Sequence, residues 1–187
     1  MSLSMYTATV PPFRSMLKNL QAVIAKAEAH CEAKKIDPGA FLGARLYPDM
    51  LPFTAQVQIA SDNAKGAAAR LAGVDIPKFE DDEASFADLH ARIDKTVAFL
   101  DTLTEAQFEG AAERDIVLQL RDRKVEFKGA SYLLQWANPN VYFHITTAYA
   151  LLRHGGVPLR PSRGATSCRR SRRDGVRPSG TWAYHAR

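Results

Sequence analysis

Residues 11–35, PPFRSMLKNLQAVIAKAEAHCEAKK, carry the longest amphipathic pattern in this chain. Its apolar residues recur at steps of three and four: Phe13, Leu17, Leu20, Ile24, Ala27 and Cys31. That spacing lines one face of an α-helix, with charged residues such as Arg14 and Lys26 lying off the stripe. At ~1.5 Å per residue the helix would be roughly 35 Å long, the length of an element in a helical bundle. Pro11 and Pro12 suit the entrance of such a helix.

The same period predicts helices near residues 50–72, 84–103 and 139–154. The helical pattern that leads into the last of these helices begins at about residue 130, and Pro139 is expected to interrupt it. Residues 115–128 instead alternate apolar and polar side chains, which is typical of a short β-hairpin. Four amphipathic helices bury their apolar faces most simply against one another. The sequence therefore predicts an all-α four-helix bundle, with the hairpin as its only sheet, inserted before the last helix.

Length and composition indicate a soluble globular protein of one domain. The chain has 187 residues, of which 46% are hydrophobic and 24% charged, enough for a sizeable core. No apolar run is long enough to span a bilayer, and the first residues lack the pattern of an export signal. Cys31 and Cys168 form neither a disulfide framework nor a metal-binding spacing. We therefore expect a reduced, cytoplasmic protein without a membrane partner.

The formal charge of +5 comes from the C-terminal end. Residues 158–187 hold eight arginines and one acid, which leaves 17 basic and 19 acidic residues in 1–157. The tail is rich in Arg, Ser, Gly and Pro and has no apolar period, so its composition predicts disorder. The expected domain is residues 1–157, followed by a basic tail at 158–187. Nucleic-acid binding by the tail is one interpretation, but we favour an extension unrelated to the work of the domain.

Three polar residues fall on the inward stripes of two predicted helices. His144 shares a face with Val141 and Leu151, and Asn140 lies four residues earlier, so both side chains can point inward. Gln56 lies on the inward stripe of the 50–72 helix. An inward polar group without a partner costs about 1–3 kcal/mol. We therefore expect these three residues to meet in a polar pocket inside the bundle.

The polar groups of these three residues can be satisfied in two ways, and the sequence leaves both interpretations open. The first is a hydrogen-bond network among Gln56, Asn140 and His144 that includes a water. The second is a divalent metal, zinc or nickel, with His144 as the anchoring ligand. One imidazole with two amides is a weak ligand set, so the network is favoured and no cofactor is required. Burial disfavours the imidazolium, and we expect His144 to be neutral.

Two helical motifs, together with a stretch near the start of the chain, resemble a known protein family. PDMLPFTAQVQIASDNAKGAAARLAG (residues 48–73) and NVYFHITTAYALLRHGGV (140–157), with MYTATVPPFRSMLKNL (5–20), resemble a bacterial family called domain of unknown function 1993. The resemblance covers about residues 1–157 and places the chain in the DinB-like superfamily of metal-dependent four-helix bundles. Proteins of that superfamily hold a divalent metal with three histidines, one in the second helix and two spaced four apart in the fourth. The corresponding positions are Gln56, Asn140 and His144, of which only the last is histidine.

The resemblance and the residues together leave three functions. The favoured one is binding of a small molecule in the polar pocket, with a degenerate metal site. The alternative is a metal-dependent (thiol) transferase or hydrolase of DinB-like type, with His144 as ligand and a water in an open position. The third is nucleic-acid association through the tail. A homodimer is the expected assembly if the chain oligomerises. Asp62 and the acidic loop at residues 81–83 are expected to be solvated.

Overall fold

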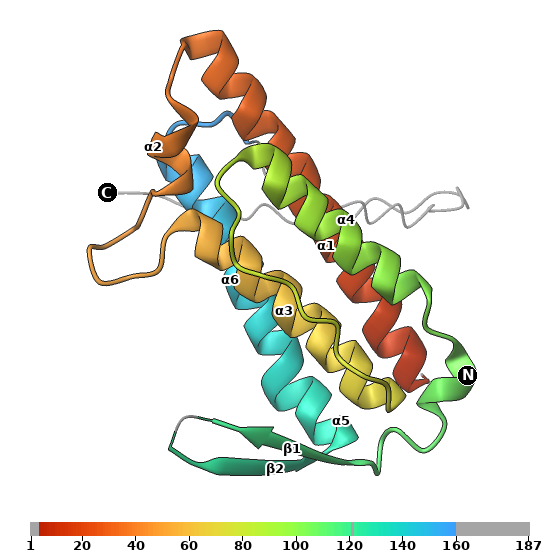
Figure 1. Cartoon of the computed structure of the whole chain (residues 1–187). Coiled ribbons are helices and arrows are strands. Elements are labelled where there is room, and N and C mark those ends of the chain that lie inside the picture. The colour runs from red at the N-terminus through yellow and green to blue at the C-terminus, as the bar shows by residue number, and fades with distance from the viewer. Residues whose placement is uncertain (1–3, 121, 160–187) are drawn as a thin grey trace, which may run out of the picture.

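The computed structural model describes residues 4–120 and 122–159 (Figure 1). Its long helices are α1 (Met5–Lys34), α3 (Phe53–Ala72), α4 (Phe86–Asp101) and α6 (Asn138–His154). Shorter elements are α2 (Pro38–Leu42), a 3₁₀ turn (Glu105–Phe108), α5 (Gly129–Tyr132) and a π-helical turn (Leu133–Ala137). Strands β1 (Asp115–Gln119) and β2 (Lys124–Lys128) form an antiparallel hairpin. The predicted helical bundle with a hairpin before its last helix is confirmed; the tail from residue 160 onward lies outside the described residues.

The four long helices form a ring in which α1 and α3 each pack against both α4 and α6. Ion pairs between Arg14 and Asp101, at 3.3 Å, and between Glu28 and His90, at 3.7 Å, show that α1 and α4 are antiparallel. Helices α3 and α4 run in the same direction, because the connection between them returns along the length of α3 (Figure 1). We call this connection, residues 73–85, the crossover segment.

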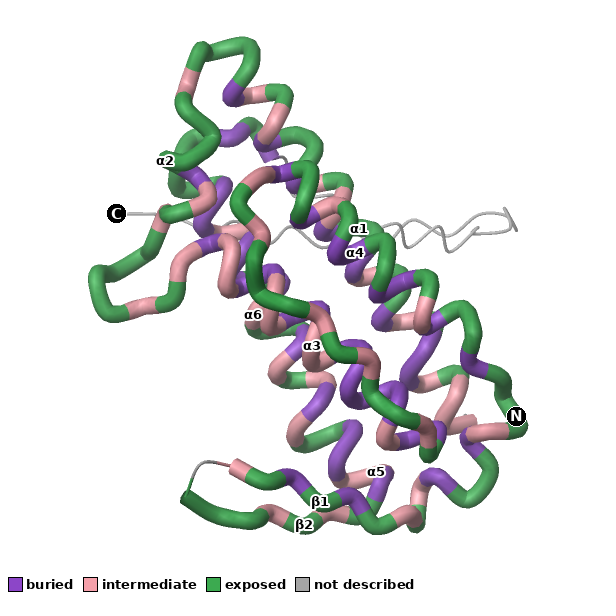
Figure 2. Tube along the Cα trace, in the orientation of Figure 1, coloured by how far each residue is buried: buried purple, intermediate pink, exposed green. Residues whose placement is uncertain are grey.

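The core lies where the apolar stripes of the helices meet (Figure 2). Every residue of the predicted stripe of the first helix is buried, from Phe13 to Cys31. Burial of these stripes is the main favourable term in forming the bundle. Within the described part of the chain, no helix combines the length and the apolar character needed to cross a membrane.

Helix α1 begins six residues earlier than predicted, so Pro11 and Pro12 lie inside it rather than at its entrance. The hydroxyl of Ser4 caps the helix by accepting the N–H of Thr7 at 3.1 Å. An interior proline costs about 3 kcal/mol, because it removes a hydrogen bond and crowds the preceding turn. Val10, in the same turn, is buried in the core, and packing of this first part of the helix offsets that cost.

The last helical region is continuous across Pro139, which differs from the predicted interruption. The residues that join α5, the π-helical turn and α6 all have right-handed helical backbone angles. In the π-helical turn the N–H of Asn138 bonds to the carbonyl of Leu133, five residues back. A π turn is wider than an α turn, and Pro139 follows it in the first turn of α6, where a missing N–H is tolerated.

The hairpin is held against the bundle by a close backbone approach. Ile116 and Leu118 turn inward and are buried. Directly after β2, a Cβ atom on Gly129 would lie 1.8 Å from the carbonyl oxygen of Ala111. Only glycine fits there, and the N–H of Ala130 bonds to Ala112 at 2.9 Å. A lone hairpin is marginally stable in water, and this backbone contact at the start of α5 holds it against the bundle.

Candidate functional site

Gln56 and His144 meet between α3 and α6. Gln56 lies in the first turn of α3 and is 3% exposed, whereas His144 lies in the middle of α6 and is half-buried. The ring atom Nδ1 of His144 is 2.7 Å from Oε1 of Gln56. Two polar side chains that the sequence placed on inward stripes are therefore in direct contact.

The contacts of Gln56 determine the tautomer of His144. Nε2 of Gln56 donates to the carbonyl oxygen of Leu51 at 3.2 Å. A carbonyl can only accept, so the amide nitrogen faces Leu51 and the amide oxygen faces the ring. Nδ1 must then carry a proton and donate it to Gln56. In the neutral ring this leaves the lone pair on Nε2.

Burial lowers the pKa of His144 below the ordinary value of a histidine, because an apolar environment disfavours the imidazolium. The neutral ring is therefore the stable form at neutral pH. The unfolded chain takes up this proton at a higher pH than the folded chain does. His144 consequently lowers the stability of the fold as the pH falls through the ordinary histidine range.

The remaining ring nitrogen of His144 is open to a ligand. Among the residues that the structure describes, Nε2 makes no hydrogen bond, and it is not one of the buried polar atoms that lack a partner. The ring as a whole is half-buried, and Nε2 is its unpaired nitrogen in the described part of the chain. The ring of Phe143 packs edge-on against His144 with centroids 5.1 Å apart, and Phe143 is 58% exposed. The site thus offers one hydrogen-bond acceptor beside an apolar surface.

Asn140 is not joined to this pair by a hydrogen bond. Its Nδ2 donates to the carbonyl oxygen of Trp136 at 2.7 Å, one turn back in the same helical rod. Short polar side chains commonly make such local bonds to backbone groups. The structure therefore brings together two of the three predicted residues, and Asn140 lies one turn away.

These residues do not fit a resident divalent metal. Oε1 of Gln56 accepts from His144, and the amide of Asn140 is a poor ligand for zinc or nickel. That leaves Nε2 of His144 as the one good donor at the three superfamily positions. In the described part of the chain no three His, Cys, Asp or Glu side chains are grouped so that they could hold a metal ion.

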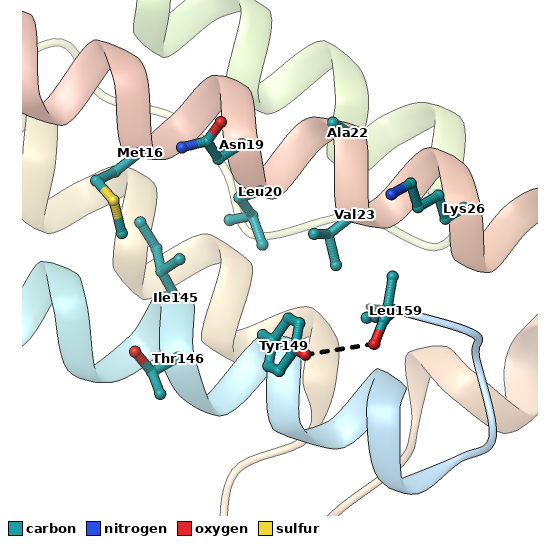
Figure 3. A pocket seen from close by; sticks show the side chains of 10 residues that line it. All are labelled: Met16, Asn19, Leu20, Ala22, Val23, Lys26, Ile145, Thr146, Tyr149 and Leu159. Atoms are coloured by element: carbon teal, nitrogen blue, oxygen red, sulfur yellow. Dashed lines mark hydrogen bonds between the residues drawn. The ribbon is translucent and has the colours of Figure 1, made fainter. Parts of the chain in front are cut away.

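A groove of about 340 Å³ lies on another side of α6, against α1 (Figure 3). Ile145 and Tyr149 project from α6 into it, and Met16 and Val23 project from α1. The hydroxyl of Tyr149 lies 3.5 Å from the carbonyl of Leu159, whose side chain closes one end and is buried. Neither Gln56 nor His144 lines this groove, so α6 presents its histidine and its apolar groove residues to different neighbours.

A buried charge network was not predicted. Arg92 of α4 is 1% exposed, and its guanidinium lies 2.9 Å from both Asp62 and Asp81 and 2.8 Å from Glu83. These acids were expected to be solvated. The side chains of Asp62 and Asp81 are 42% and 61% exposed, in line with that expectation, whereas that of Glu83 is only 7% exposed. One feature of the sequence could have indicated this network: Arg92 lies three residues after Leu89, on the inward stripe of its helix.

The network fastens the crossover segment to α3 and α4. Arg92 also donates to the backbone carbonyl of Glu80 at 2.9 Å, and Lys65 of α3 lies over the ring of Phe79 at 3.7 Å. Burial raises the pKa of Glu83, but hydrogen bonds from Arg92 and Gln58 outweigh it and lower the pKa below its ordinary value. Glu83 is therefore charged at neutral pH, and we assign the network a structural role.

The long helices define a four-helix bundle in which α3 and the last helical region are antiparallel, as the Gln56–His144 and Arg70–Tyr132 contacts show. Residues 5–161 match the family model described as Domain of unknown function (DUF1993). The chain belongs to this family, as the sequence motifs indicated.

A solved structure supports the same assignment. The chain is similar to a crystallised DinB family member protein from Shewanella denitrificans, with 43% sequence identity and a TM-score of 0.79. The similarity covers 83% of this chain and 88% of that one. Among curated proteins, no sequence matches this chain.

Proposed function

We propose that this protein binds a small molecule with an O–H or N–H donor between α3 and α6, through Nε2 of His144. The observation that supports this function is the chain of contacts from Leu51 through Gln56 to the ring, at 3.2 and 2.7 Å. A buried amide orients the imidazole and holds its proton on Nδ1. A binding group that is oriented before the ligand arrives loses less freedom on binding.

The chemistry of the site limits the ligand to a class. Nε2 of a neutral ring accepts a hydrogen bond, so the ligand must present an O–H or N–H donor. The exposed ring of Phe143 and the exposed side chain of Leu51, whose backbone carbonyl contacts Gln56, favour an apolar or aromatic body beside that donor. Sites of this type combine apolar walls with few convergent polar groups. Asn140, one turn along α6, is a second candidate contact.

The other two candidate functions have less support. A metal-dependent (thiol) transferase or hydrolase would need more ligands than His144, and the positions of Gln56 and Asn140 supply amides. Association with nucleic acid would depend on the arginines of the tail, which lie outside the described residues. A homodimer stays a prediction.

A screen of small phenols and indoles by saturation-transfer NMR tests the proposal. We expect ligands that bind the parent protein and lose at least ~10-fold in affinity in His144→Leu, since a buried or half-buried hydrogen bond is worth about 1–2 kcal/mol. His154→Leu, an exposed histidine on the same helix, is the matched control and should bind like the parent.

His144→Leu leaves Oε1 of Gln56 without its donor, so the Gln56→Leu/His144→Leu variant is measured beside it. Replacing both partners by apolar groups costs less stability than removing one. If folded His144→Leu and the double variant bind every hit as the parent does, the ring only fills the core and the proposal is wrong.

A further inference from the structure

A second hollow, of about 320 Å³, lies at the other end of the α3–α6 pair, where the hairpin covers it. It is bounded by α3, the end of β1, α5 and the π-helical turn. The residues that matter for its chemistry are Asn63, Arg70, Leu118, Leu120, Tyr132 and Trp136. The Gln56–His144 contact lies outside this hollow, so a ligand bound here is independent of the function proposed for that contact.

Arg70 brings a positive charge without a counter-charge into this hollow. Its Nη1 donates to the hydroxyl oxygen of Tyr132 at 3.3 Å. Considering residues 4–120 and 122–159, no carboxylate forms a salt bridge with Arg70, whereas Arg14 has one such partner and Arg92 has three. A guanidinium presents several N–H donors in a fixed plane and binds carboxylates in pairs of hydrogen bonds.

Tyr132 adds a second donor next to that charge. The side chain is 2% exposed, and its hydroxyl oxygen already accepts from Arg70. In the described part of the chain the hydroxyl proton has no acceptor. Burial, only partly opposed by Arg70, raises the pKa of Tyr132, so the hydroxyl keeps its proton. A buried hydroxyl of this kind donates to whichever acceptor enters the hollow.

Gly66 and Phe127 help to position the Arg70 guanidinium and the Tyr132 ring. Gly66 lies one turn before Arg70, and a Cβ atom there would be 2.7 Å from Nη1 of Arg70. The missing side chain lets the guanidinium fold back along α3 toward Tyr132. The ring centroid of Phe127 lies 6.0 Å from those of both Tyr132 and Trp136, so Phe127 packs against both aromatic side chains.

Asp62 also lines the hollow, and its carboxylate is paired with two cations. Its carboxylate, two turns before Arg70 on α3, lies 2.9 Å from Arg92 and 2.8 Å from Lys65. These two cations reduce the repulsion between Asp62 and an incoming anion, although Arg92 also pairs with Asp81 and Glu83. The rest of the wall is mixed: Asn63 and Gln119 are polar, and Ile59, Leu118, Leu120 and Trp136 are apolar or aromatic.

We propose that this hollow binds a small organic carboxylate with an apolar body. The carboxylate accepts from the Arg70 guanidinium and the Tyr132 hydroxyl, and the body lies against Trp136, Leu118 and Leu120. A charged anchor beside apolar and aromatic side chains is a common combination in small-ligand sites.

The probe is 3-phenylpropionate, observed by the fluorescence of Trp136 in a Trp182→Phe background, which removes the other tryptophan. We expect saturable binding with a Kd on the order of 1 mM, as suits a small ligand with one anchor. The neutral 3-phenylpropionamide and inorganic phosphate should each bind at least ~10-fold more weakly, because one lacks the charge and the other the apolar body. Arg70→Gln should weaken the carboxylate by the same factor, and Arg14→Gln, an exposed arginine, should not.

Tyr132→Phe keeps the ring and removes the donor, so it tests the site even if Arg70→Gln does not fold; we expect a threefold to tenfold loss. The proposal fails if the carboxylate does not saturate, if the amide or phosphate binds as tightly, or if both folded variants bind like the parent.

Discussion

A Gln56→His/Asn140→His double variant is expected to bind Zn²⁺ or Ni²⁺ at least ~100-fold more tightly than the parent chain, since a first ligand contributes more than the 10–100-fold that its outer partners do. Gln56 already contacts His144, and Asn140 lies one turn before it on α6. The substitutions would place two imidazoles four residues apart on α6 and a third opposite them on α3. Three histidines with one open position form a common zinc site.

Metal affinity is measured by competition with a chromophoric chelator, and the thermal midpoint is recorded with and without metal. A ligand that binds only the folded chain raises its stability, so metal should stabilise the double variant and leave the parent unchanged. Gln58→His/Asn140→His is the matched control, because Gln58 bonds to Glu83 on the side of the crossover segment. Equal affinities for the two double variants would show that Gln56 and His144 do not occupy the ligand positions.

Arg92→Met is expected to destabilise the fold by about 3 kcal/mol, the lower end of the 3–5 kcal/mol seen when one partner of a buried ion pair is removed. The lower end applies because the side chains of Asp62 and Asp81 are partly exposed and water can solvate them. Glu83 is not exposed in this way, and without Arg92 its charge stays buried against α4. The free energy of unfolding, obtained from urea denaturation, measures the loss.

The pH dependence of that loss identifies its cause. In the parent, Arg92 lowers the pKa of Glu83, so this stabilisation is present above the ordinary glutamate pKa and lost as the pH falls through the folded value. In Arg92→Met the effect of burial on Glu83 is opposed only by the hydrogen bonds from Gln58 and the backbone, so the pKa of Glu83 is higher than in the parent. Protonation of Glu83 in acid therefore costs the variant less stability than it costs the parent. The gap between the two proteins should narrow toward pH ~4. Arg92→Met/Glu83→Gln should recover part of the lost stability. A gap that does not change with pH, with no recovery, would indicate lost packing instead of a lost charge pair.

Periodicity predicted the bundle because burial of apolar side chains dominates the energetics of helices of this length. It did not predict that α3 and α4 run in the same direction. That arrangement depends on the crossover segment, which is fastened by Arg92 and Lys65, residues that composition alone would place on a solvated surface. The start of α1 was misplaced for a related reason, since packing of Val10 overrides the local preference of Pro11 and Pro12.

The candidate site could likewise be predicted only in part from helical periodicity. Helical phase correctly placed Gln56 and His144 on facing sides of α3 and α6. It gave the same phase to Asn140, whose amide bonds instead to the carbonyl of Trp136, next to a π-helical turn that no period reveals. Arg70 and Tyr132 are 62 residues apart in sequence, and only the antiparallel pairing of α3 with the last helical rod brings them together.

The tautomer and the pKa of His144 test the central claim most directly, and both come from long-range ¹H–¹⁵N correlation spectra of the ring during a pH titration. We predict a neutral ring protonated on Nδ1 at neutral pH, with an Nε2 resonance typical of an unprotonated nitrogen and a pKa below the ordinary value of about 6.5. In Gln56→Leu the preference for the Nδ1 proton should be lost. A ring protonated on Nε2, or a pKa above that ordinary value, would contradict the proposed site, because the site requires a neutral ring whose lone pair is on Nε2.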